Sequence, residues 1–379
     1  MSGAVTGYGA LRAGEQPASL CARTADGVVD LVAALDAGAL DLAPALHDAL
    51  RMPQLNALMA LGRDAAAQLD AAVGALGDAE RLAPATGAEP VLPFAVADYA
   101  DFFAARHHAQ NCGRMLRPDG DPLTPNWEWM PVAYHGRSGT VIVSGTPVVR
   151  PRGQVFGAEG GPVYGPSAWL DLEVELGLVV GTPSQCGEPV VVEHAEQHLF
   201  GLVVLNDWSA RDIQAWESQP LGPHLGKSFA TSISPWVVPW DALPRAQPHA
   251  PARDPLPYLR DAPGHGLDVD VSLEVNGEAV SRSSALELAW TPAQLVAHLT
   301  ANGASLRTGD LLGTGTISGP EPESRGCLLE RTWAGQEPLT LPSGRVLTWL
   351  EDGDEALITA RARGIDLGVV RGRIEPAGG

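Results

Sequence analysis

The sequence predicts a protein that is mostly β with some α, and three patterns lead to this prediction. Residues 169–181 (WLDLEVELGLVVG) alternate apolar and polar side chains with the period of two that a strand requires. A second strand-like run, residues 268–275 (DVDVSLEV), meets Asn276-Gly277, which is a strong signal for a two-residue hairpin. Alternation returns in residues 339–374 around two turns that contain glycine.

Length, charge and cysteine content narrow the class of protein. The chain has 379 residues with 45% hydrophobic content, enough for one large domain and a smaller one. Its formal net charge of -20 disfavours nucleic acids and anionic membranes as partners, because proteins that bind polyanions need a surplus of Lys and Arg. No apolar run approaches the ~20 residues that span a bilayer, so we expect a soluble protein. The scattered cysteines described next lead us to expect a cytoplasmic location. Four scattered cysteines predict reduced thiols and neither a disulfide framework nor a cysteine zinc site: Cys21, Cys112, Cys186 and Cys327.

The first part of the chain carries little chemistry. Short strands are expected within residues 19–35 and a helix at residues 63–76. A stretch rich in proline and glycine, residues 85–93, then predicts a linker. We therefore expect an N-terminal domain, residues 1–90, and a second domain, residues 91–379, which contains all candidate catalytic residues.

Acidic residues occupy one side of the most regular strand. Asp171, Glu173 and Glu175 face one way, while the leucines and valines between them face the other. Two interpretations remain open, a solvated face or a metal site. Glu173 and Glu175 would lie ~7 Å apart, and at an effective dielectric constant of 20 their repulsion of ~2 kcal/mol would require a cation if the face is buried. Mg²⁺ or Ca²⁺ suits carboxylates without thiolates, with Asp101 and Asp207 as the natural further ligands.

Two predicted helices place polar residues on one face. A helix over residues 98–111 would put Asp101 and His108 on the same side. A second helix begins at Trp208, directly after a buried strand. It aligns four polar side chains at spacings of four, three and four residues: Asp207, Arg211, Gln214 and Ser218.

The rest of the chain adds further candidates. Lys227 and Thr231 follow the second helix, in a segment that resembles a phosphate-binding loop only superficially, because three residues rather than four separate its glycines. A glycine-rich stretch around Thr316 would let the backbone approach a ligand, and Glu330 is expected on the strand that follows. The HxExH arrangement in residues 194–198 has its glutamate in the wrong place for a zinc helix and favours a solvated helix face.

Five segments together resemble the fumarylacetoacetase family, in the same order and with comparable spacing: DFFAARHHAQN, MPVAYHGRSGTVIVSGTPVVRPRGQ, LDLEVELGLVVG, NDWSARDIQAWESQPLGPHLGKSFATSISPWVVP and GTISGPEPESRGCLLE. The resemblance covers the chain from Asp98 to its C-terminus and is weak in residues 1–90. It implies a small SH3-like N-terminal barrel and a large mixed β-roll or β-sandwich catalytic domain. It also implies a homodimer and metal-dependent hydrolysis of the carbon–carbon bond of a β-diketone. The products would be fumarate and acetoacetate, at the end of tyrosine and phenylalanine catabolism.

The resemblance also implies roles for individual residues. His108 would be the general base, oriented by Glu330. The family's metal-binding carboxylates would be Asp101, Glu173, Glu175 and Asp207, with Lys227 and Thr231 at a Mg²⁺ subsite. Donors to the developing alkoxide would be Arg211, Gln214 and Lys227. The positions that match substrate-binding residues are Phe103, Arg117, Tyr134, Arg211, Gln214, Ser218 and Thr316.

The substrate-binding positions contain departures from the family pattern. Phe103 and Ser218 replace tyrosines, and His224 replaces a phenylalanine. Phe103 lacks the phenol donor, and leaving a buried polar group without its partner costs ~1–3 kcal/mol. An enzyme of another pathway is therefore an alternative, acting on a bulkier diketone or as a decarboxylase, isomerase or hydratase. A non-catalytic scaffold that keeps a structural ion is a further alternative.

Overall fold

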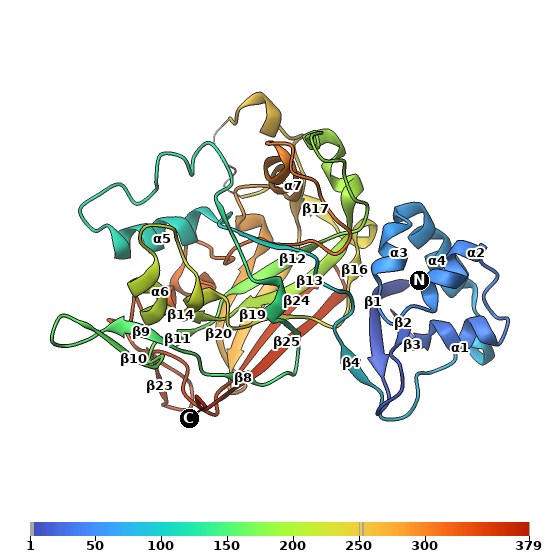
Figure 1. Cartoon of the computed structure of the whole chain (residues 1–379), viewed down its shortest axis with the longest axis horizontal. Helices are drawn as coiled ribbons and strands as arrows, with labels where there is room; N and C mark the ends of the chain where they lie inside the picture. Colours follow the sequence, from blue (N-terminus) through green and yellow to red (C-terminus); the bar gives the residue numbers. More distant parts are fainter. Residues whose placement is uncertain (1–3, 250, 252–253, 379) are drawn as a thin grey trace.

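Three β-sheets form the framework of the protein in a computed structural model, which describes residues 4–249, 251 and 254–378 (Figure 1). The N-terminal sheet has the strand order β3 (Gly27–Asp30), β2 (Ser19–Thr24), β1 (Val5–Arg12) and β4 (Glu89–Val91). The largest sheet has the order β6 (Ala133–His135), β5 (Tyr99–Phe102), β21 (Leu311–Gly313), β12 (Val174–Val180), β13 (Leu199–Asp207), β15 (Thr231–Ile233) and β7 (Val141–Val143), with β16 (Val238–Pro239) also paired to β13. The third has the order β20 (Glu278–Ser284), β19 (Asp270–Val275), β24 (Glu355–Ala362), β25 (Ile365–Glu375) and β8 (Val148–Val149).

Smaller elements surround these sheets. Two-stranded pairs are β9 (Arg152–Phe156) with β10 (Pro162–Pro166), β11 (Leu170–Asp171) with β14 (Ser209–Ala210), β17 (Arg245–Ala246) with β18 (Gly266–Leu267), and β22 (Leu339–Thr340) with β23 (Val346–Leu347). The α-helices are α1 (Leu31–Asp36), α2 (Pro44–Leu50), α3 (Asn56–Ala60), α4 (Arg63–Ala75), α5 (Arg106–Leu116), α6 (Arg211–Glu217), α7 (Pro292–Thr300) and α8 (Leu328–Arg331). Short 3₁₀ helices occupy Asp78–Glu80, Ser138–Thr140, Val192–His198, Leu225–Lys227, Trp240–Ala242, Pro257–Leu259, Ala285–Glu287 and Pro322–Ser324. Among the described residues, no helix has the length and apolar content needed to cross a membrane.

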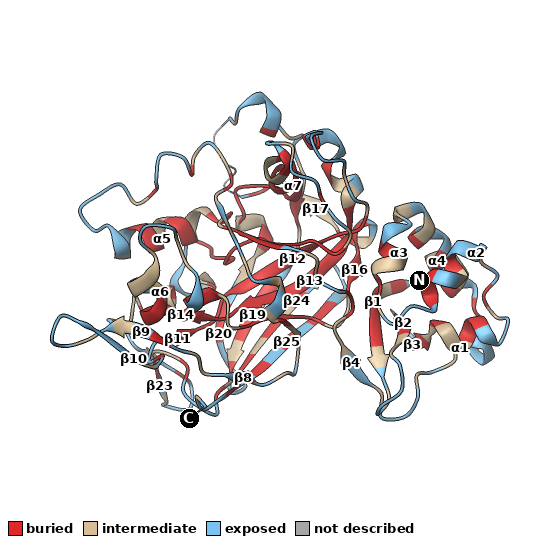
Figure 2. Ribbon diagram, viewed as in Figure 1, coloured by how far each residue is buried: buried red, intermediate tan, exposed pale blue. Residues whose placement is uncertain are grey.

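The largest sheet is buried on both faces. Leu176 and Leu178 of β12 pack into a core shared with the five-stranded sheet, whereas Val179 packs into a second core with residues of the N-terminal region. Every residue of β12 and β13 is buried, and these two strands are red in Figure 2. The predicted alternation along β12 is therefore confirmed, but its polar residues do not face solvent. Acids at the end of this strand must be neutralised inside the protein.

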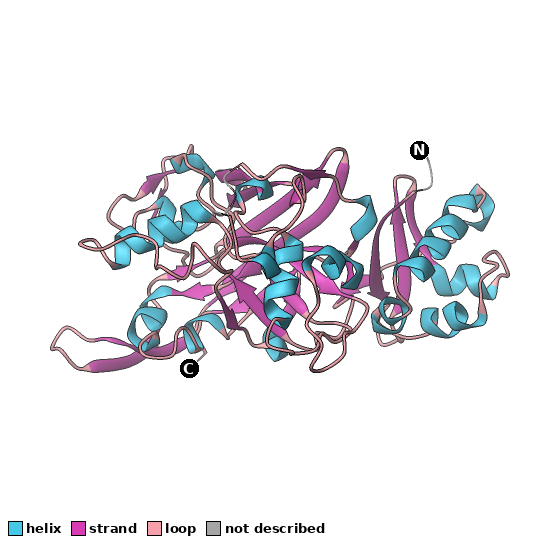
Figure 3. Ribbon diagram, turned by 90° about the horizontal axis from the view of Figure 1, so that it is seen from above, coloured by secondary structure: helices cyan, strands magenta, loops and turns pink. Residues whose placement is uncertain are grey.

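Several predicted elements are confirmed. The hairpin between β19 and β20 turns at Asn276 and Gly277, whose φ angles of 53° and 78° suit a two-residue turn of the mirror-image type. Helix α4 covers residues 63–75 of the predicted 63–76. The helices of the N-terminal region lie on one side of its sheet, at the right of Figures 1 and 3.

Other elements differ from the prediction because pairing between distant residues overrides local pattern. Residues 99–102 form β5 rather than the start of a helix, since they pair with β21 and β6; helix α5 begins only at Arg106. Residues 209–210 pair with β11, which delays the second predicted helix until Arg211. Glu330 lies on the short helix α8, not on a strand. The predicted linker contains β4, which pairs with β1.

Candidate active site

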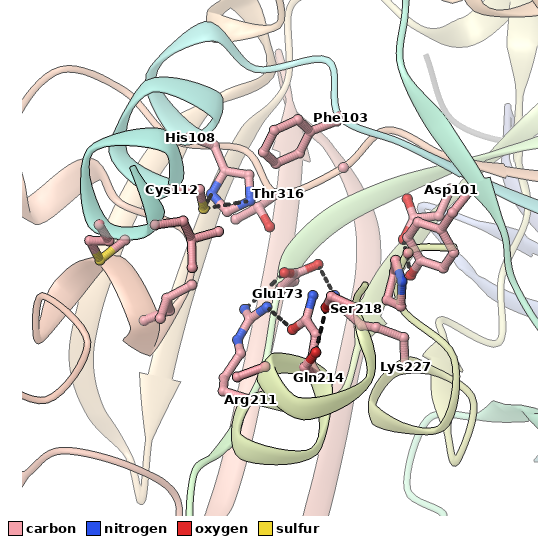
Figure 4. Close-up of a pocket in the computed structure, with 18 of the residues that line it drawn as sticks. Asp101, Phe103, His108, Cys112, Glu173, Arg211, Gln214, Ser218, Lys227 and Thr316 are labelled. Atoms are coloured by element: carbon pink, nitrogen blue, oxygen red, sulfur yellow. Dashed lines mark hydrogen bonds and ion pairs between the residues drawn. The ribbon is translucent and has the colours of Figure 1, made fainter. Parts of the chain in front are cut away.

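A cavity of about 490 Å³ lies between α5, α6 and the end of the largest sheet (Figure 4). This volume is typical of a pocket for a small ligand. Part of its wall is apolar, including Met115, Leu116, Trp169 and Trp349. The acidic and basic side chains that line it are Asp101, His108, Glu173, Arg211 and Lys227. The cavity therefore combines an apolar wall with a few buried charges.

Four buried carboxylates gather beside this cavity. One oxygen from each of Asp101, Glu173, Glu175 and Asp207 lies within 4.8 Å of the others. Strand pairing brings them together: β5 carries Asp101, β12 carries Glu175 with Glu173 just before its start, and β13 ends at Asp207. Strand β21 lies between β5 and β12 in the sheet. The four acids predicted as metal ligands are thus the acids that the structure assembles, although Asp101 reaches the site from a strand rather than from a helix.

Gly313 makes room for this carboxylate cluster. A Cβ atom at this position would lie 2.5 Å from Asp101 Oδ1 and 3.0 Å from Glu175 Oε2. Real Cβ atoms essentially never approach an oxygen to 2.5 Å, so a side chain here would push the acids apart. The glycine-rich stretch was predicted to let the backbone approach a ligand. At Gly313 the missing side chain instead leaves space for the carboxylates of Asp101 and Glu175.

Two cations neutralise only one side of the cluster. Lys227 Nζ lies 2.6 Å from Glu173 Oε2 and 2.8 Å from Asp207 Oδ2, and Arg211 Nη2 lies 2.8 Å from Glu173 Oε1. Burial alone would raise the pKa of Glu173, but Lys227 and Arg211 hold it well below its ordinary range. Thr231 Oγ1 also donates to Asp207 Oδ1 at 3.2 Å.

On the other side of the cluster, Asp101 and Glu175 form no ion pair within the part of the chain that the structure describes. Burial and the charge on Asp207 raise the pKa of Asp101 to about 8, and burial and Asp101 raise the pKa of Glu175 well above its ordinary value. One buried oxygen of each side chain, Asp101 Oδ1 and Glu175 Oε1, has no hydrogen-bond partner among the described residues. A buried acceptor without a partner is costly. The cluster therefore fits a hard divalent cation, which prefers oxygen ligands of this kind.

Tyr134 and Tyr99 support the same acids. Tyr134 OH lies 2.5 Å from Asp207 Oδ2 and 3.0 Å from Asp101 Oδ2, and Tyr99 OH donates to Asp101 Oδ2 at 3.1 Å. Tyr134 lines the cavity, as expected of a substrate-binding position, yet its hydroxyl contacts the carboxylates. Tyr99 was missed because it lies in the segment predicted as a helix.

His108 and Glu330 form a buried pair on the far side of the cavity from Asp101. His108 Nδ1 and Glu330 Oε2 are 2.6 Å apart. The second carboxylate oxygen accepts from Asn111 Nδ2 at 2.9 Å, and Ser318 Oγ donates to Oε2 at 2.7 Å. Burial opposes ionisation of Glu330, but His108 and these donors lower its pKa to about 2. The carboxylate is therefore ionised and accepts the hydrogen of Nδ1, which leaves His108 Nε2 as an acceptor.

The surroundings of His108 also change the pKa of its imidazole. Burial lowers the pKa of His108, but nearby Cys112 and Glu330 outweigh it, so that the pKa lies well above its ordinary value. The neutral imidazole is thus a stronger base than free histidine. The predicted pairing of His108 with Glu330 is present in the geometry.

Arg211 is held by more partners than its sequence position indicated. Its Nε donates to Asp171 Oδ2 at 2.8 Å and its Nη1 to Gln214 Oε1 at 3.1 Å. Asp171 also accepts from the backbone amides of Leu328 and Leu329, at the start of the helix that carries Glu330. Asp171 thus connects the guanidinium with the Glu330 segment. The alternation had flagged this acid, but nothing local indicated its partners.

The other predicted substrate-binding residues fall into two groups. Phe103 and Thr316 line the cavity near His108, with the Phe103 ring 4.9 Å from the imidazole and edge-on to it (Figure 4). Ser218 also lines it, but its hydroxyl donates to the Gln214 carbonyl. Arg117 does not line it: the side chain is exposed and donates to the Pro122 carbonyl at 2.9 Å.

Comparison with known families and curated proteins identifies relatives along most of the chain. The family described as "Fumarylacetoacetate (FAA) hydrolase C-terminal" matches residues 98–375. The fumarylacetoacetase of Arabidopsis thaliana is 44% identical over 379 aligned residues, which cover 93% of this chain and 90% of that protein. The fumarylacetoacetase of Homo sapiens is 46% identical over 300 residues, covering 76% of this chain and 71% of that protein.

Solved structures share the fold at lower identity. A fumarylacetoacetate hydrolase from Exiguobacterium antarcticum superposes with a TM-score of 0.58 at 17% identity, over 98% of this chain and 99% of that chain. A maleylpyruvate hydrolase from Sphingobium sp. SYK-6, solved with manganese(II) and pyruvate, gives a TM-score of 0.55 at 16% identity, over 98% of this chain and all of that one (100%). The expected fold class, with a small N-terminal sheet and a large catalytic β-structure, is confirmed.

Proposed function

Because the chain belongs to the fumarylacetoacetate hydrolase family, we propose that it is a hydrolase that cleaves the carbon–carbon bond of fumarylacetoacetate to give fumarate and acetoacetate. This reaction ends tyrosine and phenylalanine catabolism. The observation that carries the proposal is the placement of the His108–Glu330 pair and the four-carboxylate cluster at one cavity. Relatives named fumarylacetoacetase align with most of the chain and support the same substrate.

His108 activates the water. With Nδ1 donating to Glu330, Nε2 accepts a proton from a water molecule in the cavity as that water adds to a substrate carbonyl. Glu330 holds the imidazole in this tautomer and stabilises the imidazolium that forms. General base catalysis of this kind contributes ~10²- to 10⁴-fold to the rate.

Arg211, Gln214 and Lys227 provide donors for the oxygen that gains negative charge. All three line the cavity, and Arg211 is fixed by Asp171 and Glu173 before substrate arrives. Donors that are already oriented stabilise a developing alkoxide without reorganisation during the reaction. The apolar wall excludes water and strengthens these interactions.

We infer that the hard cation of this site is Mg²⁺ or Ca²⁺. Asp101, Glu173, Glu175 and Asp207 would hold it, with Lys227 and Thr231 at a Mg²⁺ subsite. When bound, such an ion supplies Lewis acidity toward the diketone oxygens. The two buried oxygens without partners, on Asp101 and Glu175, support this assignment.

The experiment that tests the function is an assay of fumarylacetoacetate hydrolysis by the purified protein with Mg²⁺ or Ca²⁺. We expect fumarate and acetoacetate in equal amounts. The variant His108→Ala then distinguishes an enzyme, whose activity should fall, from a non-catalytic scaffold, which has no activity to lose. A folded, metal-loaded protein that releases neither product would overturn the proposal.

A different diketone is a second candidate substrate. Phe103 has no hydroxyl, the Ser218 hydroxyl donates to the Gln214 backbone carbonyl, and Arg117 is not among the residues that line the cavity. These three positions therefore offer fewer polar contacts than the resemblance implies. Under this alternative, including decarboxylation or isomerisation of a related substrate, Phe103→Tyr with Ser218→Tyr should increase turnover of fumarylacetoacetate. No gain in the double variant would count against an altered pocket.

We also infer the domain organisation and the assembly. Residues 1–90 would form an N-terminal domain and residues 91–379 the catalytic domain, since β4 is the last strand of the N-terminal sheet along the chain.

A homodimer is supported by the projecting β9–β10 hairpin, which exposes 67% of Phe156 and 71% of Tyr164 (Figures 1 and 3). Sedimentation would test the dimer. The four unpaired cysteines support a cytoplasmic location.

A further inference from the structure

Two thiols flank the His108–Glu330 pair. Cys112 lies one turn after His108 on α5, and its Sγ is 3.7 Å from His108 Nε2. Cys327 is the N-cap of α8, and its Sγ is 3.3 Å from Glu330 Oε2. Buried cysteines usually act as small apolar residues. Here both sulfurs instead contact the polar atoms of the pair that activates water.

These side chains form a ligand set distinct from the carboxylate cluster. Ligand atoms of His108, Cys327 and Glu330 all lie within 4.8 Å of one another, and Cys112 adds a second sulfur beside the imidazole. Sulfur and imidazole ligands at such spacings suit the tetrahedral coordination of Zn²⁺ and similar soft cations. A site of four oxygen ligands favours hard cations instead. The cavity thus lies between the carboxylate cluster, which favours hard cations, and these thiol and imidazole side chains, which favour soft ones.

The site is reachable from the cavity. His108 and Cys112 line the cavity wall, and Cys112 is 9% exposed, whereas Cys327 and Glu330 are fully buried behind them. An ion that enters the cavity meets the imidazole and the Cys112 sulfur first. In the metal-free protein the Cys327 thiol donates to Glu330, so binding would release this proton and that of Cys112.

We propose that His108, Glu330, Cys112 and Cys327 form an inhibitory site for a soft divalent cation of the Zn²⁺ and Cd²⁺ class. The ion would occupy the imidazole and carboxylate atoms that must otherwise accept and stabilise the proton from water. Inhibition therefore rests on the proposed function, whereas binding does not. Mg²⁺ and Ca²⁺ would not bind there, because thiolates are poor ligands for hard ions.

Titration with Cd²⁺ in the presence of saturating Mg²⁺ tests the proposal. Cadmium bound to thiolates has an ultraviolet charge-transfer band, which carboxylate ligands do not produce. We expect this band to appear with one equivalent of Cd²⁺ in the wild-type protein and hydrolysis to fall in parallel. Cys112→Ser and Cys327→Ser should each weaken Cd²⁺ binding by at least about 10-fold, since even supporting residues of metal sites contribute that much.

Two controls identify the site. Cys186→Ser, which removes an exposed thiol, should keep the band, and so should Glu175→Gln, which alters only the carboxylate cluster. The single serine variants are near-isosteric, and near-identical unfolding temperatures to wild type would show that they fold. Absence of the band in the wild-type protein, or wild-type Cd²⁺ affinity in both single variants, would overturn the proposal. A band without any fumarylacetoacetate hydrolysis would leave the site standing and instead contradict the proposed function.

Discussion

The carboxylate cluster and the His108–Glu330 pair are both buried and acidic, yet they differ in how their charge is balanced. Glu330 has a partner for each oxygen, and its pKa is lowered to about 2 against the effect of burial. Asp101 and Glu175 each have an oxygen without a hydrogen-bond partner among the described residues, and burial raises the pKa of both. A carboxylate whose oxygens are hydrogen-bonded, such as Glu330, can orient a base. Buried acids that lack such partners, such as Asp101 and Glu175, are instead suited to bind a cation. This difference supports our proposal that one region transfers protons and the other binds an ion.

Replacing His108 should have the largest effect and should leave the other region intact. We expect His108→Ala to lower kcat by ~10²- to 10⁴-fold, because the base proposed to take a proton from water is lost. Calorimetric titration of the variant should still give the wild-type affinity for Mg²⁺. His194→Ala, at an exposed histidine, is the matched control. Loss of Mg²⁺ binding in His108→Ala would show that the two regions are not separate.

Glu330→Gln should change the pH dependence of the reaction. His108 acts as a base only when unprotonated, so activity falls as the pH drops below its raised pKa. Removing the negative charge of Glu330 lowers that pKa and should move the acid limb of kcat/KM to lower pH. An accompanying loss of about 10- to 10²-fold in rate is expected from a misoriented base.

Profiles of log kcat/KM against pH would measure this shift. Glu337→Gln, an exposed position, should reproduce the wild-type profile. An acid limb that does not move in Glu330→Gln would mean that Glu330 does not set the basicity of His108.

Asp101→Asn should affect stability in opposite directions with and without metal. In metal-free protein, the substitution removes a buried acid that repels its neighbours, so the free energy of unfolding should rise. When Mg²⁺ is present at 100 times its Kd, the free energy of unfolding of the wild-type protein should increase by ~2.7 kcal/mol. The variant should show only a small part of this increase. Thermal unfolding with and without Mg²⁺ measures both effects, with exposed Asp48→Asn as control. Equal responses of variant and wild type to Mg²⁺ would exclude Asp101 as a ligand.

Gly313→Ala should have the smallest effect and act on one region alone. The added Cβ would crowd Asp101 Oδ1, so Mg²⁺ affinity should weaken by about 10-fold, the scale of changes that misplace metal ligands. The pH profile set by His108 should stay unchanged. Gly165→Ala, where nothing lies within 4 Å of the new Cβ, is the matched control. Wild-type affinity in Gly313→Ala would show that the cluster relaxes around the methyl group.

The sequence predicted the parts of the fold that depend on local pattern. Alternation identified β12, and Asn276-Gly277 identified the β19–β20 hairpin. The four acids that the structure gathers were also named from the sequence, Glu173 and Glu175 for their place on one face of a strand and Asp101 and Asp207 as further ligands. Their role as metal ligands stays a prediction.

The parts that failed depend on partners distant in the sequence. The segment containing Asp101 has a helical pattern but pairs with β21, more than 200 residues later in the chain. The contact of Asp171 with Arg211 and with the start of α8, and the approach of Cys327 to the pair on α5, likewise join separated segments. No local pattern encodes such contacts. The departures at Phe103 and Ser218 were visible in the sequence, but the occupied Ser218 hydroxyl was not.

Our central proposal is that the carboxylate cluster, by binding an ion, and the His108–Glu330 pair, by transferring a proton, act together in hydrolysis. One measurement on a single sample tests it. Hydrolysis of fumarylacetoacetate would be followed in one sample through Mg²⁺ saturation, chelation and return of Mg²⁺, with unfolding temperature recorded at each stage. We predict that turnover and the added stability disappear together on chelation and return together with Mg²⁺. Turnover that continues unchanged after the metal-dependent stability has been lost would contradict the account.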